Sequence, residues 1–279
     1  MALKLMYITN TPEIALIAQR CGVDRVFVDL EYLGKEQRQP GDTVKSSHTV
    51  EDVKKLRGVL DSSELLVRVN PISERSNVFC GSKAEIDSVI SAGADIVMLP
   101  MARTVEEVRS FAEYVDGRVK TMLLLETAEA AEKIDEILDL NIIDEVHIGL
   151  NDLHLSLGKR FMFELLTDGT VERLCKKISS YGLPYGFGGI ARIGYGMLPS
   201  EHIIAEHYRL GSTAAILSRS FANVNNMKDI DEIDRLFEVE TANIRKYEST
   251  LGAYTPEMLE KNRLETVRLV EKICEKIGG

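Results

Sequence analysis

The sequence has few cysteines, and their spacing matches no common metal or redox motif. The four residues Cys21, Cys80, Cys175 and Cys274 are scattered along the chain and form no C-x-x-C pair. This spacing gives no support to a zinc site or to a disulfide framework. We therefore expect a reducing, cytoplasmic setting.

Long apolar runs and positive charge are also scarce. No stretch approaches the roughly 18 apolar residues of a membrane-spanning helix, and the opening MALKLMYITN becomes polar too early for a secretory signal. With 44 acidic residues against 34 lysines and arginines, the net charge is −10. Such an excess disfavours nucleic acid or an anionic membrane as a partner.

Eight apolar stretches alternate with amphipathic ones in the first ~220 residues, a length that suits a barrel domain. These stretches are near-continuous apolar runs, which is typical of parallel strands buried on both faces. The expected strands cover residues 3–9, 25–31, 64–70, 95–100, 119–126, 144–149, 184–190 and 212–218. The alternation predicts an α/β fold, a (β/α)8 TIM barrel. A doubly wound sheet is the alternative, but no G-x-G-x-x-G follows the first strand.

Helices are expected between these strands, and their ends carry sequence signals. The first has Thr11 as N-cap, Pro12 at its first position and Gly22 as a stop. The others cover residues 49–60, 82–93, 104–115, 127–140, 170–182 and 201–210.

The domain organisation follows from this pattern. Residues 1–225 are expected to form the barrel, with a polar loop insertion at 32–48. Residues 226–279 read as a helical C-terminal extension in which Thr255 and Pro256 open the last helix. This helix packs either on its own barrel or on a neighbouring subunit, and the sequence leaves both alternatives open.

Polar residues cluster where the predicted strands end, which is where (β/α)8 barrels carry their chemistry. Four strand ends contribute, namely Asp29 and Glu31, Arg68 with Asn70, Glu126, and Asn151 with Asp152. No lysine follows a strand in this way, which disfavours a Schiff-base mechanism.

Glu126 and Asp152 close two successive strands, so their carboxylates are expected to converge. Two carboxylates without nearby cysteine or histidine suit a hard divalent cation whose remaining ligands are water and substrate oxygens. The alternatives are that Asp152 caps the following short helix and that Glu126 pairs with an arginine. His147 and His154, which flank Asp152, are expected to be structural.

Arg68 offers a planar, permanently charged fork to a carboxylate or an enolate oxygen. Together with a cation it would stabilise an enolate, as a lyase acting on a 2-oxo acid requires. A structural ion pair with Asp29 or Glu31 is the alternative.

These residues lie in motifs that resemble one known family. The motifs are VDLE (28–31), VRVN (67–70), SAGADIVMLPM (91–101), LLLETAEA (123–130) and IGLNDLHLSLG (148–158). They resemble the HpcH/HpaI aldolase and citrate lyase β-subunit family of metal-dependent pyruvate aldolases. The resemblance implies a barrel of the phosphoenolpyruvate/pyruvate type.

The resemblance also implies roles for particular residues. Mg²⁺, Mn²⁺ or Co²⁺ would be bound by Glu126 and Asp152, and Arg68 would polarise the substrate carbonyl. Backbone amides around Asn151 and Asp152 would hold the substrate carboxylate. Subunits of such barrels commonly exchange their last helix, so a homo-oligomer, a trimer or hexamer, is expected.

The sequence departs from the family at its acid–base pair. Tyr32 stands where the pyruvate aldolases have a histidine after Asp-x-Glu, and Ser91 stands where they have an aspartate. The insertion offers His48 as a substitute, with helix entry beside Thr49 as its structural alternative. Lys35 and Arg38 are candidate ligands for a substrate carboxylate or phosphate.

Three hypotheses follow. The first is a divalent-metal-dependent carbon–carbon lyase (aldolase) acting on a 2-oxo acid, with an aldehyde as the expected second partner, through a pyruvate-type enolate. In it Arg68, Asp29 and either His48 or a metal-bound water act on the substrate, which Glu31, Lys35 and Arg38 help to bind. The second is a citrate lyase-like thioester lyase or condensing enzyme using acetyl-CoA or oxaloacetate. The third is a barrel that binds a ligand without chemistry.

Overall fold

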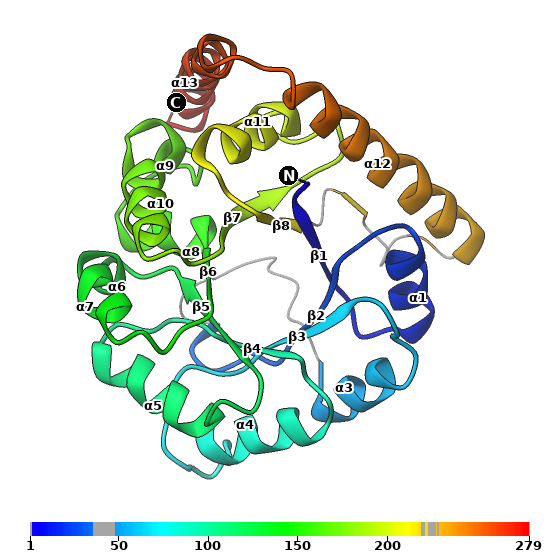
Figure 1. Cartoon of the computed structure of the whole chain (residues 1–279), viewed down its shortest axis with the longest axis vertical. Coiled ribbons are helices and arrows are strands. Elements are labelled where there is room, and N and C mark those ends of the chain that lie inside the picture. Colours follow the sequence, from blue (N-terminus) through cyan, green and yellow to red (C-terminus); the bar gives the residue numbers. More distant parts are fainter. Residues whose placement is uncertain (1, 36–47, 219–220, 223–226, 228, 279) are drawn as a thin grey trace.

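The chain folds into a closed barrel of parallel strands surrounded by helices (Figure 1). In this computed structural model, residues 2–35, 48–218, 221–222, 227 and 229–278 are described. The strands are β1 (Lys4–Ile8), β2 (Arg25–Asp29), β3 (Glu64–Arg68), β4 (Ile96–Leu99), β5 (Lys120–Leu125), β6 (Glu145–Ile148), β7 (Tyr185–Ile190) and β8 (Ala214–Leu217). They pair in sequence order, and β8 closes on β1. The predicted TIM barrel is confirmed.

The helices occupy the intervals between the strands and cover the barrel (Figure 1). They are α1 (Pro12–Arg20), α3 (Val50–Arg57), α4 (Ser82–Ser91), α5 (Val105–Val115), α6 (Ala128–Glu132), α7 (Ile134–Asp139), α8 (Leu150–Ser156), α9 (Glu164–Thr167), α10 (Thr170–Ser180) and α11 (Ser200–Leu210). The single helix expected over 127–140 is wrong. Lys133 adopts φ −91° and ψ 15°, which ends α6 and begins α7.

Side chains that alternate along the strands fill the barrel interior. Phe27, Leu66, Met98 and Met122 belong to an inner apolar cluster, while the intervening strand residues pack outward against the helices. At the amino ends of the strands, the buried Arg25 donates two hydrogen bonds of 2.7 Å to Glu145. This ion pair lies at the end of the barrel opposite to the carboxyl ends of the strands, where Asp29 and Arg68 lie.

Two long helices follow the barrel, namely α12 (Ile230–Leu251) and α13 (Pro256–Gly278). Helix α12 lies along α1, and its Phe237 meets Tyr7 of β1 edge to face at 4.8 Å. Helix α13 packs on α11 and α9 and buries Thr266 and Val270 (Figure 1). The extension thus adds to the core of its own barrel.

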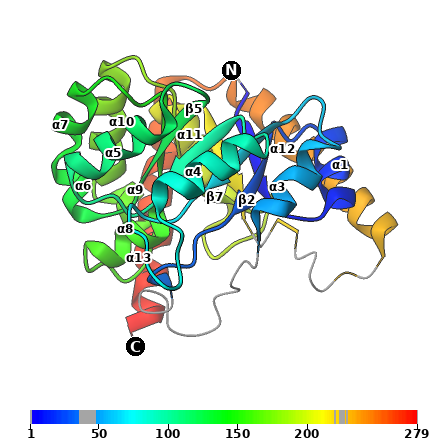
Figure 2. The same cartoon turned by 90° about the horizontal axis from the view of Figure 1, so that it is seen from below.

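Figure 2 shows the barrel from the side, with the N-terminus of the chain at one end and the last turn of α13 at the other. Within the described part of the chain, no helix combines the length and the apolar character that membrane crossing demands.

Candidate active site at the carboxyl ends of the strands

Asp29 and Arg68 form the first pair of the site because they are the last residues of neighbouring strands. The register of β2 and β3 places them opposite each other. Arg68 donates two hydrogen bonds of 2.8 Å to the Asp29 carboxylate, through Nε and Nη2. The ion-pair alternative for Arg68 is what the structure shows, and its catalytic role stays a prediction.

Lys35 and Glu31 extend this pair into a compact group of four charges. The Lys35 ammonium donates to Asp29 at 2.8 Å and lies 3.9 Å from Glu31, and Arg68 lies 3.5 Å from the same Glu31 carboxylate. The side chains of both acids are almost fully buried. Lys35 was expected to bind a substrate anion, and here it binds a carboxylate of the protein.

Burial and charge set the protonation of this group. Burial of the Asp29 carboxyl raises its pKa, but the opposing effect of the Arg68 and Lys35 cations is larger in sum and holds the pKa well below its usual range. Burial alone would lower the pKa of the Arg68 guanidinium, but Asp29 and Glu31 hold it above its usual value. The pair is therefore ionised throughout the neutral pH range.

Asn70 fixes the chain that follows β2. Its side-chain oxygen accepts the backbone N–H groups of Tyr32 and Leu33 at 2.9 and 3.0 Å. Its amide nitrogen donates to the buried Glu85 of α4 at 2.6 Å. Glu85, which sequence reasoning missed, thus orients the segment that carries Glu31 and Lys35.

Glu126 follows β5 directly and is 2% exposed. Its carboxylate accepts the backbone N–H of Met101 at 3.1 Å, and Met101 presents that N–H from a left-handed conformation with φ 55°. Burial raises the pKa of Glu126 to about 8, an effect that Arg68 opposes and that the carboxylates of Asp152 and Glu31 increase. The Arg68 cation therefore offsets only part of the effect of burial, and near neutral pH the protonated form of Glu126 is favoured.

Gly149 leaves the room that the Glu126 side chain occupies. A Cβ at position 149 would lie 2.8 Å from Oε2 of Glu126 and 2.9 Å from its Cβ. The glycine is required by this contact and not by its backbone, because φ is −81°.

Asp152 lies in the first turn of α8, which follows β6, the strand that neighbours β5. The alternative in which Asp152 is the N-cap of this helix is wrong, because the N-cap is Gly149 and Asp152 stands three residues further on. Asn151 is exposed in the same turn. The carboxylate of Asp152 adds to the raised pKa of Glu126, and the convergence of the two carboxylates on one cation stays a prediction.

The donor set fits a hard divalent cation. Within the described ranges, no group of three or more histidine, cysteine, aspartate or glutamate side chains has the arrangement of a complete metal site. Two carboxylates alone leave positions for water and substrate oxygens, which is the open coordination that Mg²⁺ tolerates. A dication beside Glu126 would also favour the ionised carboxylate that burial disfavours.

The histidines named from the sequence take different positions. His48 lies half-buried beside the site, where its Nδ1 is 3.0 Å from the backbone nitrogen of Asp29. His147 is buried in β6 with its Nε2 3.1 Å from the Gly188 carbonyl oxygen, and His154 is buried with Nδ1 3.2 Å from the Leu150 carbonyl oxygen. Both latter contacts are with backbone carbonyls, which agrees with structural roles.

Tyr32 and Ser91, which depart from the family pattern, both lie at the surface. Tyr32 is 50% exposed and donates its hydroxyl hydrogen to the Val78 carbonyl oxygen at 2.8 Å. Ser91 is exposed at the end of α4. Arg38 lies outside the described residues.

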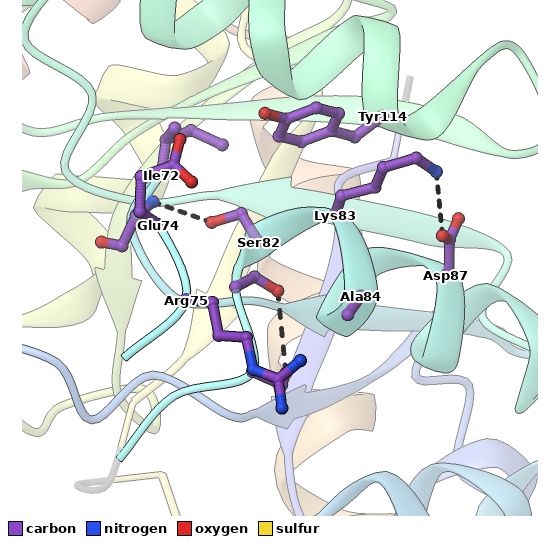
Figure 3. Close-up of a pocket in the computed structure, with 11 residues that line it drawn as sticks. Ile72, Glu74, Arg75, Ser82, Lys83, Ala84, Asp87 and Tyr114 are labelled. Atoms are coloured by element: carbon purple, nitrogen blue, oxygen red, sulfur yellow. Dashed lines mark hydrogen bonds and ion pairs between the residues drawn. The ribbon is translucent and has the colours of Figure 1, made fainter. Parts of the chain in front are cut away.

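A cavity of 410 Å³ lies beside the start of α4 (Figure 3). Its wall includes Arg75 and Lys83, and Lys83 is paired with Asp87 at 3.0 Å. None of Asp29, Arg68, Glu126 and Asp152 lines it.

Comparison with known proteins agrees with this architecture. The family model described as HpcH/HpaI aldolase/citrate lyase matches residues 4–162, which is more than half of the chain. The chain belongs to this family. The matched region contains the strand ends of β2, β3, β5 and β6 and thus the whole charged group. Family membership supports a lyase of the aldolase type.

A solved structure supports the fold of this family member. The crystal structure of an HpcH/HpaI aldolase from Desulfitobacterium hafniense DCB-2 superposes with a TM-score of 0.62 at 18% identity, over 83% of this chain and 93% of that one. At this identity the similarity concerns the fold. No curated protein sequence matches the chain.

Proposed function

We propose that this family member is a divalent-metal-dependent carbon–carbon lyase that acts on a 2-oxo acid through a pyruvate-type enolate. One observation carries the proposal. Arg68 ends β3, Glu126 follows β5 and Asp152 opens the helix after β6, so a fixed cation and two acids come from the carboxyl ends of strands of one barrel.

Glu126 and Asp152 are the residues that would hold Mg²⁺, Mn²⁺ or Co²⁺. When bound there, such an ion supplies Lewis acidity toward the oxygens of a 2-oxo acid. The two carboxylates suit it because they are hard oxygen ligands.

Arg68 supplies the fixed positive charge for the enolate oxygen. Its two bonds to Asp29 hold the guanidinium in one orientation before substrate arrives. A preorganised cation stabilises developing negative charge without reorganisation during the reaction. The backbone amides of the first turn of α8, around Asn151 and Asp152, begin a helix and suit the substrate carboxylate.

In the cleavage direction, the substrate class is a 4-hydroxy-2-oxo acid. A base removes the proton of the 4-hydroxyl group, the bond between C3 and C4 breaks, and an aldehyde leaves. The electron pair of that bond moves to C3 and the carbonyl oxygen as an enolate. Protonation at C3 then gives the 2-oxo acid, so atoms and charge balance.

The enolate step is tested by exchange of pyruvate methyl protons in deuterium oxide, with and without Mn²⁺. The expected result is Mn²⁺-dependent exchange that Glu126→Gln, Asp152→Asn and Arg68→Lys each reduce by about a hundredfold or more. Glu132→Gln, an exposed acid on α6, is the matched control and should exchange like the wild type. Absence of exchange, or unchanged Mn²⁺ affinity in both metal-site variants, contradicts the proposal.

Tyr32 favours a second candidate, a citrate lyase-like enzyme that uses acetyl-CoA or oxaloacetate. Its hydroxyl is held by Val78, so this side chain does not take the place of the histidine found in the pyruvate aldolases. Micromolar binding of acetyl-CoA without pyruvate exchange would select this candidate. Binding of a 2-oxo acid with neither activity would indicate a barrel that binds a ligand without chemistry.

A further inference from the structure

The hydrogen bond between His48 and Asp29 fixes the tautomer of the His48 ring. The backbone N–H of Asp29 points at Nδ1 of His48 over 3.0 Å. An amide N–H donates and has no lone pair with which to accept, so Nδ1 must be the unprotonated nitrogen. The neutral ring therefore carries its proton on Nε2.

The surroundings of His48 favour this neutral ring. Burial lowers the pKa of His48, and the Lys35 ammonium adds to that effect, whereas the carboxylates of Asp29 and Asp52 oppose it. A second proton on the ring would also place two N–H donors against each other at Nδ1.

A ring in this state has no lone pair to offer to a substrate proton. Nδ1 uses its lone pair on the Asp29 amide, and the nitrogen at Nε2 already carries hydrogen. The ring becomes a base only after it leaves Asp29. The sequence-based hypothesis in which His48 removes the proton is therefore not supported by this geometry.

The partner of His48 is the residue that orients Arg68. Asp29 receives Nε and Nη2 of Arg68 and Nζ of Lys35 on its carboxylate, while its amide donates to His48. His48 thus restrains the backbone at the residue whose side chain holds both cations. It stands immediately before Thr49, whose side chain caps α3, so the ring is attached to a rigid element.

We propose that His48 is a positioning residue that acts through the Asp29 backbone on the Asp29–Arg68 pair, and that it remains neutral, with its proton on Nε2, at the pH of catalysis. This role rests on the proposed function, since it concerns the lyase reaction. Water at the site, and not the His48 ring, then transfers the proton. Lys35 is a positioning residue for the same pair, because it shares the Asp29 carboxylate with Arg68.

The tautomer is measured directly by nitrogen–proton correlation spectra of the five histidine rings in the metal-free protein. Loss of one ring signal in His48→Asn assigns His48. The expected result is a proton on Nε2 and no change of state between about pH 6 and pH 8. His154 and His202 are internal references of the opposite tautomer, since their Nδ1 atoms face the oxygens of Leu150 and Asn262. A proton on Nδ1 of His48, or protonation of the ring near pH 7, overturns the proposal.

The positioning role is tested with two substitutions of His48 whose side-chain amides take the place of different ring nitrogens. His48→Asn keeps an acceptor near the place of Nδ1, whereas His48→Gln moves the polar group toward Nε2. The Arg68 Nε–H resonance should persist in the Asn variant and shift or broaden in the Gln variant. This readout needs no activity, so it decides the proposal even where the exchange assay fails and the proposed function is wrong.

Activity gives the second test. We expect kcat/KM of the Asn variant to lie within about threefold of wild type. That of the Gln variant should fall by up to about tenfold, as for loss of one hydrogen bond. The pH profile of kcat/KM should keep its limbs in the Asn variant. Equal losses in both variants, together with loss of one limb, would show that the ring itself transfers the proton.

Discussion

The space around Glu126 is shaped by two residues that act through their backbones. Met101 turns its N–H toward the carboxylate, and Gly149 omits the Cβ that would meet it. Neither residue has a side chain that sequence reasoning associates with metal binding. The motif VMLPM pointed to position 101 without giving its reason, which is the left-handed conformation there.

Gly149→Ala should disturb Glu126 more than it disturbs the fold. The added methyl group must displace Oε2 and Cβ of Glu126, since those atoms would lie 2.8 and 2.9 Å away. We expect a loss of about 1–3 kcal/mol in the free energy of unfolding and at least tenfold weaker Mn²⁺ binding, measured by urea titration and calorimetry. Gly252→Ala, where the nearest atom is 3.5 Å away, is the control. Wild-type Mn²⁺ affinity in Gly149→Ala would contradict this account of Glu126.

The burial of His147 should make the free energy of unfolding depend on pH. Burial lowers its pKa to about 4, and its Nδ1 is buried without a hydrogen-bond partner among the described residues. In the unfolded chain the His147 ring is protonated below about pH 6.5, whereas in the folded chain it is protonated only below about pH 4. The stabilisation is therefore complete above pH 6.5 and is lost as the pH falls toward 4, by about 3 kcal/mol.

His147→Gln should remove this part of the acid sensitivity, because a glutamine amide can still donate to the Gly188 carbonyl but does not titrate. Urea titrations at pH 7.5 and pH 4.5 measure it, and the difference at pH 7.5 gives the packing cost alone. Equal acid sensitivity in the two proteins would show that His147 is not the group concerned.

Among the elements, α3 connects the barrel wall to the site. Its first turn has a reciprocal cap, in which Thr49 accepts the Asp52 N–H and Asp52 accepts the Thr49 N–H. Helix α5 has the same device at Thr104 and Glu107, but it begins far along the chain from His48. Removing the cap of each helix in turn therefore distinguishes an effect on stability, expected for both helices, from an effect on the position of His48, expected for α3 alone.

Thr49→Ala and Thr104→Ala should each lower the free energy of unfolding by about 1 kcal/mol. Only Thr49→Ala should also lower kcat/KM, by about threefold to tenfold, since it loosens the attachment of His48. Parallel denaturation and kinetic measurements check both statements. An equal kinetic effect in Thr104→Ala would mean that helix stability alone affects the rate.

The elements were predictable from the sequence because the strands are largely apolar runs and helices such as α3, α5 and α6 begin at a capping threonine. The charged group was predictable in part, since strand ends of a closed barrel meet at one edge. The contact of Lys35 with Asp29 was not, because Lys35 lies in a loop without a pattern. Neither was Glu85, whose sequence position on α4 reads as ordinary surface although the residue is buried beneath Asn70.

At the scale of the molecule, α12 belongs to the same core as the barrel. Phe237 is fully buried between Tyr7 and Phe221, at ring distances of 4.8 and 5.3 Å. We expect Phe237→Ala to lower the free energy of unfolding by about 3–5 kcal/mol in one cooperative transition. Val239→Ala, an exposed position on the same helix, should change it by less than about 0.5 kcal/mol. Two separate transitions, with the barrel unaffected, would show that the extension folds independently.

Association remains a prediction. Helix α13 exposes Met258, Leu264 and Ile277, each at 44% or more, while it packs on its own barrel. We expect a homo-oligomer, a trimer or hexamer, in light scattering at micromolar concentration. A monomer at that concentration would contradict the prediction.

The convergence of Lys35 and His48 on one aspartate has a consequence for engineering. The two residues border positions 36–47, and both are held by Asp29, so the chain enters and leaves that segment at a common anchor. A library confined to positions 36–47 therefore leaves Asp29, Glu31, Lys35 and Arg68 unchanged. Segments from relatives can be grafted between the same two end points, and selection for altered substrate preference can proceed there while Asp29, Lys35 and His48 are kept.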